Sequence, residues 1–104
     1  RRYRVEITAV AEGDIEEIFA FIAQDDPGAA RRWVLEVERQ ISTLEQFPLR
    51  CPIIPEARDL GRSYRHLVHG NYRTIFTLRG RVVVILRVIH GARLLDFGVL
   101  ISEN

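Results

Sequence analysis

The side chains best suited to chemistry in this chain are four arginines and a histidine towards its C-terminal end: Arg65, Arg73, Arg87, His90 and Arg93. A guanidinium keeps its charge at any physiological pH and presents a planar fork of N–H donors that matches a phosphate or a carboxylate. A histidine titrates near neutral pH and can give or take a proton. Gathered on one surface, these groups would bind an anion or act on a phosphate.

Three strand-like runs carry or precede these residues: Tyr64–His69, Tyr72–Leu78 and Val82–Ile89. Short links that contain glycine, Gly70-Asn71 and Arg79-Gly80-Arg81, join the runs, which predicts an antiparallel meander. Because successive strand residues point to opposite faces, a meander can bury one face and hold cations rigidly on its surface. The pattern therefore predicts a fixed cationic site for an anionic or protein target.

Each of these residues also has a plainer interpretation. A single arginine on a strand can be a solvated residue that discourages pairing with another sheet edge. Arg87 interrupts an apolar run and would need a partner if buried, so it fits a structural ion pair as well as a site. His90 follows the last strand and fits either a general acid or base or a structural role, and His66 and His69 have weaker claims.

Other kinds of site lack support in the sequence. There is no glycine-rich phosphate loop, and three scattered histidines with one cysteine give no metal-ligand spacing, so we expect no cofactor and no metal. Cys51 has no neighbours that indicate a nucleophile, and a single cysteine excludes an internal disulfide, which fits the reducing cytoplasm. No apolar run approaches the roughly 20 residues of a membrane span, so we expect no membrane association.

The net charge of +1 conceals an uneven distribution. Residues 1–46 carry six arginines against ten acids, whereas residues 47–104 carry nine arginines against four acids. All fifteen cations are arginine, so the chain has no lysine for amine catalysis. The length of 104 residues fits one domain, 1–104.

The N-terminal half predicts one strand and two helices. Tyr3–Thr8 alternates apolar and polar residues, and Thr8 can cap a helix whose apolar residues include Ile15, Ile18 and Ile22. Asp26-Pro27 is typical of the start of a second helix, which stops near Pro48. Two amphipathic helices with a short link form an antiparallel hairpin.

Several further expectations follow from this pattern. The acidic residues Glu12, Asp14, Glu16 and Glu17 should form the outer face of the first helix, and Trp33 should fill the interface between helices and sheet. Leu49–Gly61 should be a loop with a short turn at Glu56–Leu60, and the tail Leu94–Asn104 fits a short helix or a loose end. The element order β-α-α-β-β-β predicts an α+β fold, with a small antiparallel sheet packed against the N-terminal helical hairpin.

In its motifs and their order, the chain resembles the RelE/ParE superfamily of toxins from bacterial type II toxin–antitoxin systems. The resemblance covers nearly the whole length and includes the Asp26-Pro27 link, the Phe47-Pro48 break and the segment 55–61. Its most specific parts are Gly70-Asn71-Tyr72-Arg73 and Val88-Ile89-His90-Gly91-Ala92-Arg93.

The resemblance implies one of two activities. RelE-like members cut mRNA in the ribosome and place several cations and a C-terminal tyrosine around the scissile phosphate. Position by position, Arg73 and Arg93 match arginines of that set and Arg65 stands for one of its two lysines, whereas the other lysine position falls near Leu67. The nearest aromatic after Arg93 is Phe97, which has no hydroxyl to act on a proton.

In a nuclease of this composition, the acid and the base would fall to His90 or His66, which departs from the RelE pattern. The ending of the last strand is more similar to the ParE branch, whose members inhibit DNA gyrase. We therefore expect a ParE-like cytoplasmic toxin that arrests growth by inhibiting DNA gyrase and is neutralised by a cognate antitoxin. The resemblance also implies a role in plasmid stabilisation and a toxin–antitoxin hetero-oligomer.

The alternative is a RelE-like, ribosome-dependent mRNA endoribonuclease, whose partners would be the ribosome and mRNA. On either interpretation, Arg65, Arg73, His90 and Arg93 are the candidate site residues. We expect Arg73 and Arg93 to matter to toxicity more than to folding, and Trp33 to matter to folding.

Overall fold

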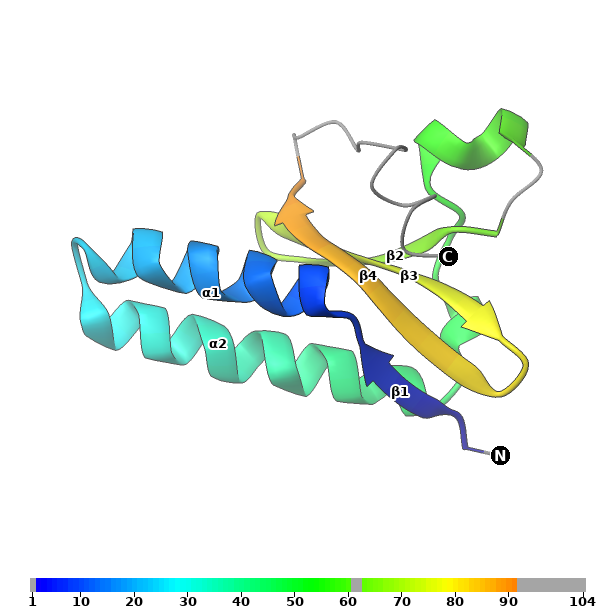
Figure 1. Ribbon diagram of the computed structural model, residues 1–104, viewed down its shortest axis with the longest axis horizontal. Helices are drawn as coiled ribbons and strands as arrows, with labels where there is room; N and C mark the ends of the chain where they lie inside the picture. Colours follow the sequence, from blue (N-terminus) through cyan, green and yellow to red (C-terminus); the bar gives the residue numbers. More distant parts are fainter. Residues whose placement is uncertain (1, 61–62, 92–104) are drawn as a thin grey trace.

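The computed structural model describes residues 2–60 and 63–91 (Figure 1). Along the chain it forms β1 (Arg4–Ile7), α1 (Ala9–Ala23), α2 (Pro27–Ser42), β2 (Arg65–His69), β3 (Tyr72–Arg79) and β4 (Val82–His90). Short 3-10 segments lie between α2 and β2: η1 (Thr43–Glu45), η2 (Pro48–Arg50) and η3 (Pro55–Leu60). Arg93 and the tail 94–104 lie outside the described residues.

Both helices begin where the sequence predicts. The Thr8 hydroxyl accepts a hydrogen bond from the Ala11 N–H at 3.2 Å, and an Asp26 carboxylate oxygen accepts from the Ala29 N–H at 3.0 Å. Pro27 occupies the first turn of α2, where its missing N–H costs nothing. The helix α2 itself ends at Ser42, earlier than predicted, and η1 and η2 fill the stretch up to Arg50.

The sheet has four strands in the order β1-β4-β3-β2. The meander β2-β3-β4 is antiparallel as predicted, but β1 runs parallel to β4, so the sheet is mixed rather than antiparallel throughout. Alternation along β1 reveals which of its faces is buried but carries no information about its direction. The α+β class and the helical hairpin on one face of the sheet are confirmed (Figure 1).

Two tight turns and one bulge set the register of the meander. Gly70 and Gly80 both have φ of 59°, in the left-handed region that glycine enters without steric cost. Between β3 and β4, Ile75 pairs with Arg87 while Phe76 pairs with Ile85, which leaves Leu86 as an extra residue in β4.

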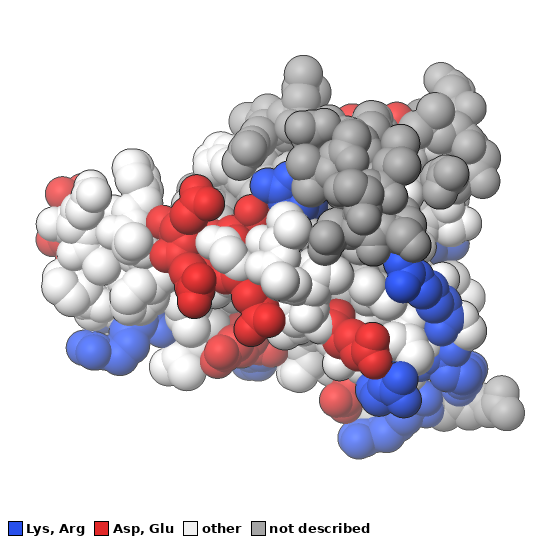
Figure 2. Space-filling view, in the orientation of Figure 1, with Lys and Arg blue, Asp and Glu red and all other residues white. Residues whose placement is uncertain are grey.

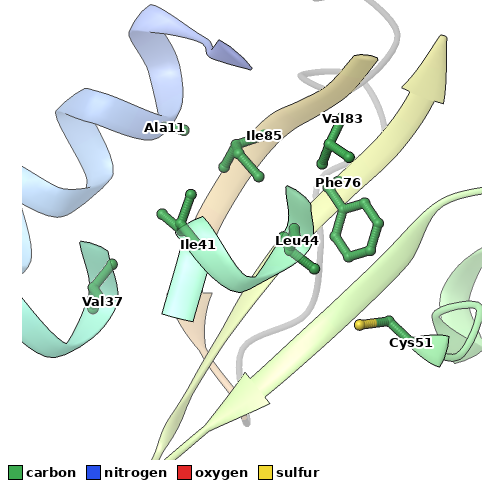
Figure 3. Packing of buried hydrophobic residues seen from close by; sticks show 8 residues of the cluster. All are labelled: Ala11, Val37, Ile41, Leu44, Cys51, Phe76, Val83 and Ile85. Carbon is green, nitrogen blue, oxygen red and sulfur yellow. The ribbon is translucent and has the colours of Figure 1, made fainter. Parts of the chain in front are cut away.

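The central strands β3 and β4 are buried on both faces. On the helix side, Phe76, Val83 and Ile85 pack against α1, α2 and η1, as Figure 3 shows. On the opposite side, Ile75, Val84 and Leu86 pack against Ile54 and Ala57. The continuous apolar run in β4 is explained by this position between two layers.

Trp33 lies at the helix–sheet interface, as predicted. It is half-buried against the helix-side core, and its ring meets the Tyr72 ring edge-on with centroids 5.3 Å apart. The Trp33 Nε1 is buried and has no hydrogen-bond partner among the described residues. Within residues 2–60 and 63–91, no helix combines the length and apolar character needed to cross a membrane.

Candidate functional site

Arg73 lies in the middle of a buried polar cluster on the sheet face away from the helices. Its side chain is 5% exposed as a residue, and its Nη1 donates to Glu56 Oε1 at 3.1 Å while Nη2 pairs with Glu56 Oε2. Glu56 belongs to η3, which packs on this face of the sheet through Ala57. A two-pronged pair of this kind compensates for much of the cost of burying the guanidinium.

His66 completes this cluster from the neighbouring strand β2. Its Nδ1 lies 3.3 Å from Arg73 Nη1. Burial lowers the pKa of His66, the nearby Arg73 charge lowers it further, and Glu56 partly opposes both. His66 therefore favours the neutral form, in which Nδ1 can accept a hydrogen bond from Arg73.

Arg65 points away from this cluster. Arg65 pairs with Phe76 and Val68 pairs with Arg73 in an unbroken register, so strand alternation places Arg65 and Arg73 on opposite faces. The Arg65 Nη1 donates to the carbonyl oxygens of Cys51 at 2.6 Å and Leu49 at 3.4 Å. Arg65 thus fastens the η2 region to the sheet.

Arg87 is held in a structural ion pair, one of the two roles that its sequence context allowed. It is 7% exposed, and its Nε and Nη2 donate to the two carboxylate oxygens of Asp14 at 2.7 and 3.0 Å. The Val88 N–H also donates to Asp14 at 2.9 Å. The prediction that Asp14 lies on the outer face of α1 is therefore wrong, because its carboxylate faces β4 and accepts hydrogen bonds from Arg87 and Val88.

His90 is exposed at the end of β4, where it lies next to an aromatic residue of β3. Its ring meets the Tyr72 ring edge-on at 5.5 Å between centroids, and Tyr72 in turn contacts Trp33. A cavity of about 310 Å³ lies beside it, with Glu17, Ile18 and Phe21 of α1 on its far wall.

The predicted cationic residues consequently occupy separate places. Arg73 is on the outer sheet face, Arg65 is on the helix side beside η2, and His90 lies at a strand end next to Tyr72. Arg93 lies outside the described residues. The shared cationic surface that the strand pattern suggested is not formed by the described candidates.

Among the described residues, the other titratable groups form neither a metal site nor an activated nucleophile. His69 Nε2 lies 3.0 Å from the Thr74 hydroxyl, and burial lowers the pKa of His69 against an opposing effect of Glu36. Burial raises the pKa of the Cys51 thiol, which keeps it protonated and unreactive. The described residues contain no group of three or more His, Cys, Asp or Glu side chains that could hold a metal ion.

A groove that sequence reasoning missed lies at the opposite end of the sheet from His90. It has a volume of about 490 Å³, and its walls include Tyr3, Phe47, Leu49, Arg50 and Arg81. Phe47 has φ of 51° and ψ of 51°, which is unusual for a bulky residue, and it is 76% exposed. In the sequence, Phe47-Pro48 indicated only the end of a helix.

A local hydrogen-bond network holds the Phe47 turn. The Arg50 Nη1 donates to the carbonyl oxygens of Gln46 at 2.7 Å and Phe47 at 3.1 Å, and its Nη2 donates to the Thr43 hydroxyl at 2.9 Å. These acceptors are neutral, and no carboxylate of the described residues pairs with Arg50. The groove therefore combines an exposed aromatic side chain with a fixed cation.

Arg81 supplies the second cation of this groove. Its guanidinium carbon lies 4.4 Å from the centre of the Tyr3 ring, and no carboxylate of the described residues pairs with it. Figure 2 shows basic side chains along the end of the molecule that holds β1 and the β3–β4 turn, whereas acidic side chains gather over the helices. The groove thus lies at the basic end of the molecule.

Comparison with known proteins places this geometry in context. A family model described as the ParE toxin of type II toxin–antitoxin system, parDE, matches residues 5–95. The toxin–antitoxin complex RelBE2 from Mycobacterium tuberculosis contains a chain with 26% identity and a TM-score of 0.64, covering 86% of this chain and 99% of that one.

A second solved structure, the chromosomal ParDE toxin–antitoxin system from P. aeruginosa, shares the fold. It has 18% identity and a TM-score of 0.68, and the match covers 86% of this chain and 96% of that chain. A comparison with curated proteins finds no match.

Proposed function

Because the chain belongs to the ParE toxin family of type II toxin–antitoxin systems, we propose that it arrests growth by inhibiting DNA gyrase and that a cognate antitoxin neutralises it. The observation that carries this proposal is the engagement of Arg73 by Glu56. An RNA-cleaving site needs cations directed at one phosphate. Here the described arginine best placed for that task is already paired with a carboxylate.

The position of Arg65 supports the same proposal. A phosphate held by Arg73 on the outer face of the sheet could not also contact Arg65, which binds loop carbonyls on the helix side. Inhibition of an enzyme by binding requires complementary surface rather than a set of acid, base and phosphate ligands. The described residues supply such a surface at the groove beside Phe47.

One observation favours the nuclease alternative. His66 is shifted towards its neutral form beside a guanidinium, and a neutral imidazole can take a proton from a 2′-hydroxyl. For this to serve RNA cleavage, the substrate phosphate would have to displace Glu56 from Arg73. Glu56 would then compete with the substrate phosphate for Arg73.

Two assays on the purified full chain separate these functions. We expect inhibition of supercoiling by purified DNA gyrase and no codon-linked cleavage of translated mRNA in primer extension. The variant His66→Gln should inhibit gyrase as the wild type does, because it removes the candidate base beside Arg73 without touching the Phe47 groove. Cleavage of mRNA that disappears in His66→Gln, with supercoiling unaffected, would reverse the assignment.

The antitoxin part of the proposal has its own test. Co-expression with the neighbouring gene product should yield a stable complex and restore growth. Failure of that product to bind or to relieve growth arrest would contradict neutralisation by an antitoxin, whatever the cellular target.

A further inference from the structure

The groove at the basic end of the molecule has the composition of a protein-docking site. It is walled by Tyr3, Phe47 and Leu49, of which Phe47 and Leu49 are 76% and 58% exposed. Large apolar side chains scattered singly on a surface need no explanation, but these two flank Pro48 on one turn and line one concave surface. Their arrangement indicates a place for an apolar side chain of a partner.

The backbone of Phe47 gives a second reason. A residue with a Cβ rarely adopts positive φ, and such conformations concentrate at sites with a function. Pro48 disfavours the right-handed helical conformation at Phe47, and the two hydrogen bonds from Arg50 to the Gln46 and Phe47 carbonyls fix the turn. The aromatic ring is thus presented to solvent by a rigid turn, as an anchor would be.

Charge then selects the partner. Arg50 and Arg81 line the groove, and neither has a carboxylate partner among the described residues. Two other arginines flank Tyr3 in the sequence, but both have carboxylate partners: Arg2 pairs with Glu45, and Arg4 pairs with Glu6. An incoming segment that carries carboxylates would therefore meet two guanidinium groups that have no carboxylate partner among the described residues, in the same groove as the apolar side chains.

From these features we infer that the Phe47 groove binds an acidic segment of a partner protein, with an apolar side chain seated against Phe47 and Leu49 and carboxylates paired with Arg50 and Arg81. The inference rests on the proposed function only for the identity of that partner, the antitoxin. A nucleic acid would also be attracted to the two cations, but its phosphates would leave the apolar side chains of Phe47 and Leu49 exposed to water.

Binding of defined probes to the purified full chain tests the inference. The first probe is a short fluorescein-labelled peptide of alternating glutamate and leucine around a central tryptophan. Its twin replaces every glutamate by lysine, and a DNA duplex of random sequence is the third probe. In fluorescence anisotropy, we expect the acidic peptide to bind at least about tenfold more tightly than its lysine twin. Binding should weaken as salt is added.

Substitution of Phe47 separates an anchor from a structural residue. Phe47→Asn removes the ring but suits the left-handed backbone, so its melting temperature should be unchanged or higher while its affinity for the acidic peptide falls about tenfold or more. Leu49→Ser provides a second variant if Phe47→Asn misfolds. Arg81→Gln should lower the affinity a few-fold and flatten its salt dependence.

Matched controls lie outside the groove. Leu35→Asn changes another exposed apolar residue, and Arg31→Gln changes another exposed arginine, so neither should alter peptide binding. No binding of the acidic peptide, equal binding of the lysine twin, or unchanged affinity in Phe47→Asn and Leu49→Ser would overturn the inference. So would a DNA duplex that binds in its place and is lost in Arg81→Gln.

The readout is independent of gyrase. A chain that leaves supercoiling untouched but binds the peptide through Phe47 refutes the proposed target and retains the docking site. A chain that inhibits gyrase while Phe47→Asn binds the peptide unchanged does the reverse.

Discussion

Two pairs of arginines in this molecule differ in burial and in whether a carboxylate binds them. Arg73 and Arg87 are 5% and 7% exposed, and each is gripped by both oxygens of a carboxylate, from Glu56 and Asp14 respectively. Arg50 and Arg81 lie at the rim of the Phe47 groove without a carboxylate partner among the described residues.

This difference distinguishes the arginines that stabilise the fold from those that remain able to bind a partner. Burying a guanidinium is costly, and the cost is offset only while its carboxylate and the other hydrogen bonds stay in place. Removing one partner of such a pair should unfold the protein before it reveals a function. A cation in contact with water contributes little to stability, so its substitution should report on binding alone.

The largest effect that would sharpen this contrast is expected at Arg87. Arg87→Met leaves the Asp14 carboxylate buried beneath α1, and should lower the free energy of unfolding by about 3–5 kcal/mol. Urea unfolding measures the loss. The double variant Asp14→Leu, Arg87→Met should be more stable than Arg87→Met alone, because no charge is then left buried. Single and double variants of equal stability would show that the pair has no such role.

Substitution of Arg73 should lower the free energy of unfolding less than substitution of Arg87 does. The sequence suggested that Arg73 matters to toxicity more than to folding. Because Arg73 is buried, Arg73→Ala should instead lower the free energy of unfolding by about 2–3 kcal/mol. The loss is smaller than at Arg87 because the Glu56 side chain is 16% exposed against 10% for Asp14, so leaving its carboxylate without the arginine costs less. Glu56→Gln should destabilise less than Arg73→Ala. A melting temperature unchanged in Arg73→Ala would restore the view of Arg73 as a functional rather than a structural residue.

The His66 beside Arg73 should make stability depend on pH. Its folded pKa is lowered below the ordinary value of 6.5, so the unfolded chain binds a proton more readily than the folded one. Stability is therefore full above pH 6.5 and falls as the pH drops from 6.5 towards the folded pKa. Urea midpoints measured across this range should fall less steeply in His66→Gln, and His69, whose pKa is also lowered by burial, accounts for a remaining slope. A His66→Gln profile identical to that of the wild type would contradict the shift.

The smallest effect is expected at the rim. Arg81→Gln removes a stacking contact with Tyr3 at an exposed position, and should change the free energy of unfolding by no more than about 0.5 kcal/mol. Thermal unfolding alongside Arg31→Gln provides the comparison. A loss as large as that of Arg73→Ala would mean that the rim arginines, too, belong to the fold.

The sequence was sufficient for the elements that depend on local chemistry. The caps at Thr8 and Asp26 and the glycine turns at Gly70 and Gly80 follow from neighbours in the chain and were predicted. The predicted bounds of the three meander strands fell within one residue of the observed bounds.

What the sequence could not supply are partners that meet only in the folded chain. Asp14 lies 73 residues from Arg87, and Glu56 lies 17 residues from Arg73 in a segment without periodicity, so no spacing rule connects either pair. Alternation alone could not show that Arg65 and Arg73 lie on opposite faces, because this depends on the register of β2 against β3. The same limit explains the direction of β1, whose pairing with β4 depends on the path of everything between them.

That pairing of β1 with β4 also decides when the protein can fold during synthesis. The Thr8 hydroxyl, which caps α1, itself donates to the Ile85 carbonyl oxygen 77 residues later. While the ribosome is still making β2 and β3, the helical hairpin has no central strand to pack on. Folding must wait until β4 leaves the exit tunnel, and a topology with such distant contacts folds slowly. The nascent chain therefore presents no finished sheet until β4 has been made.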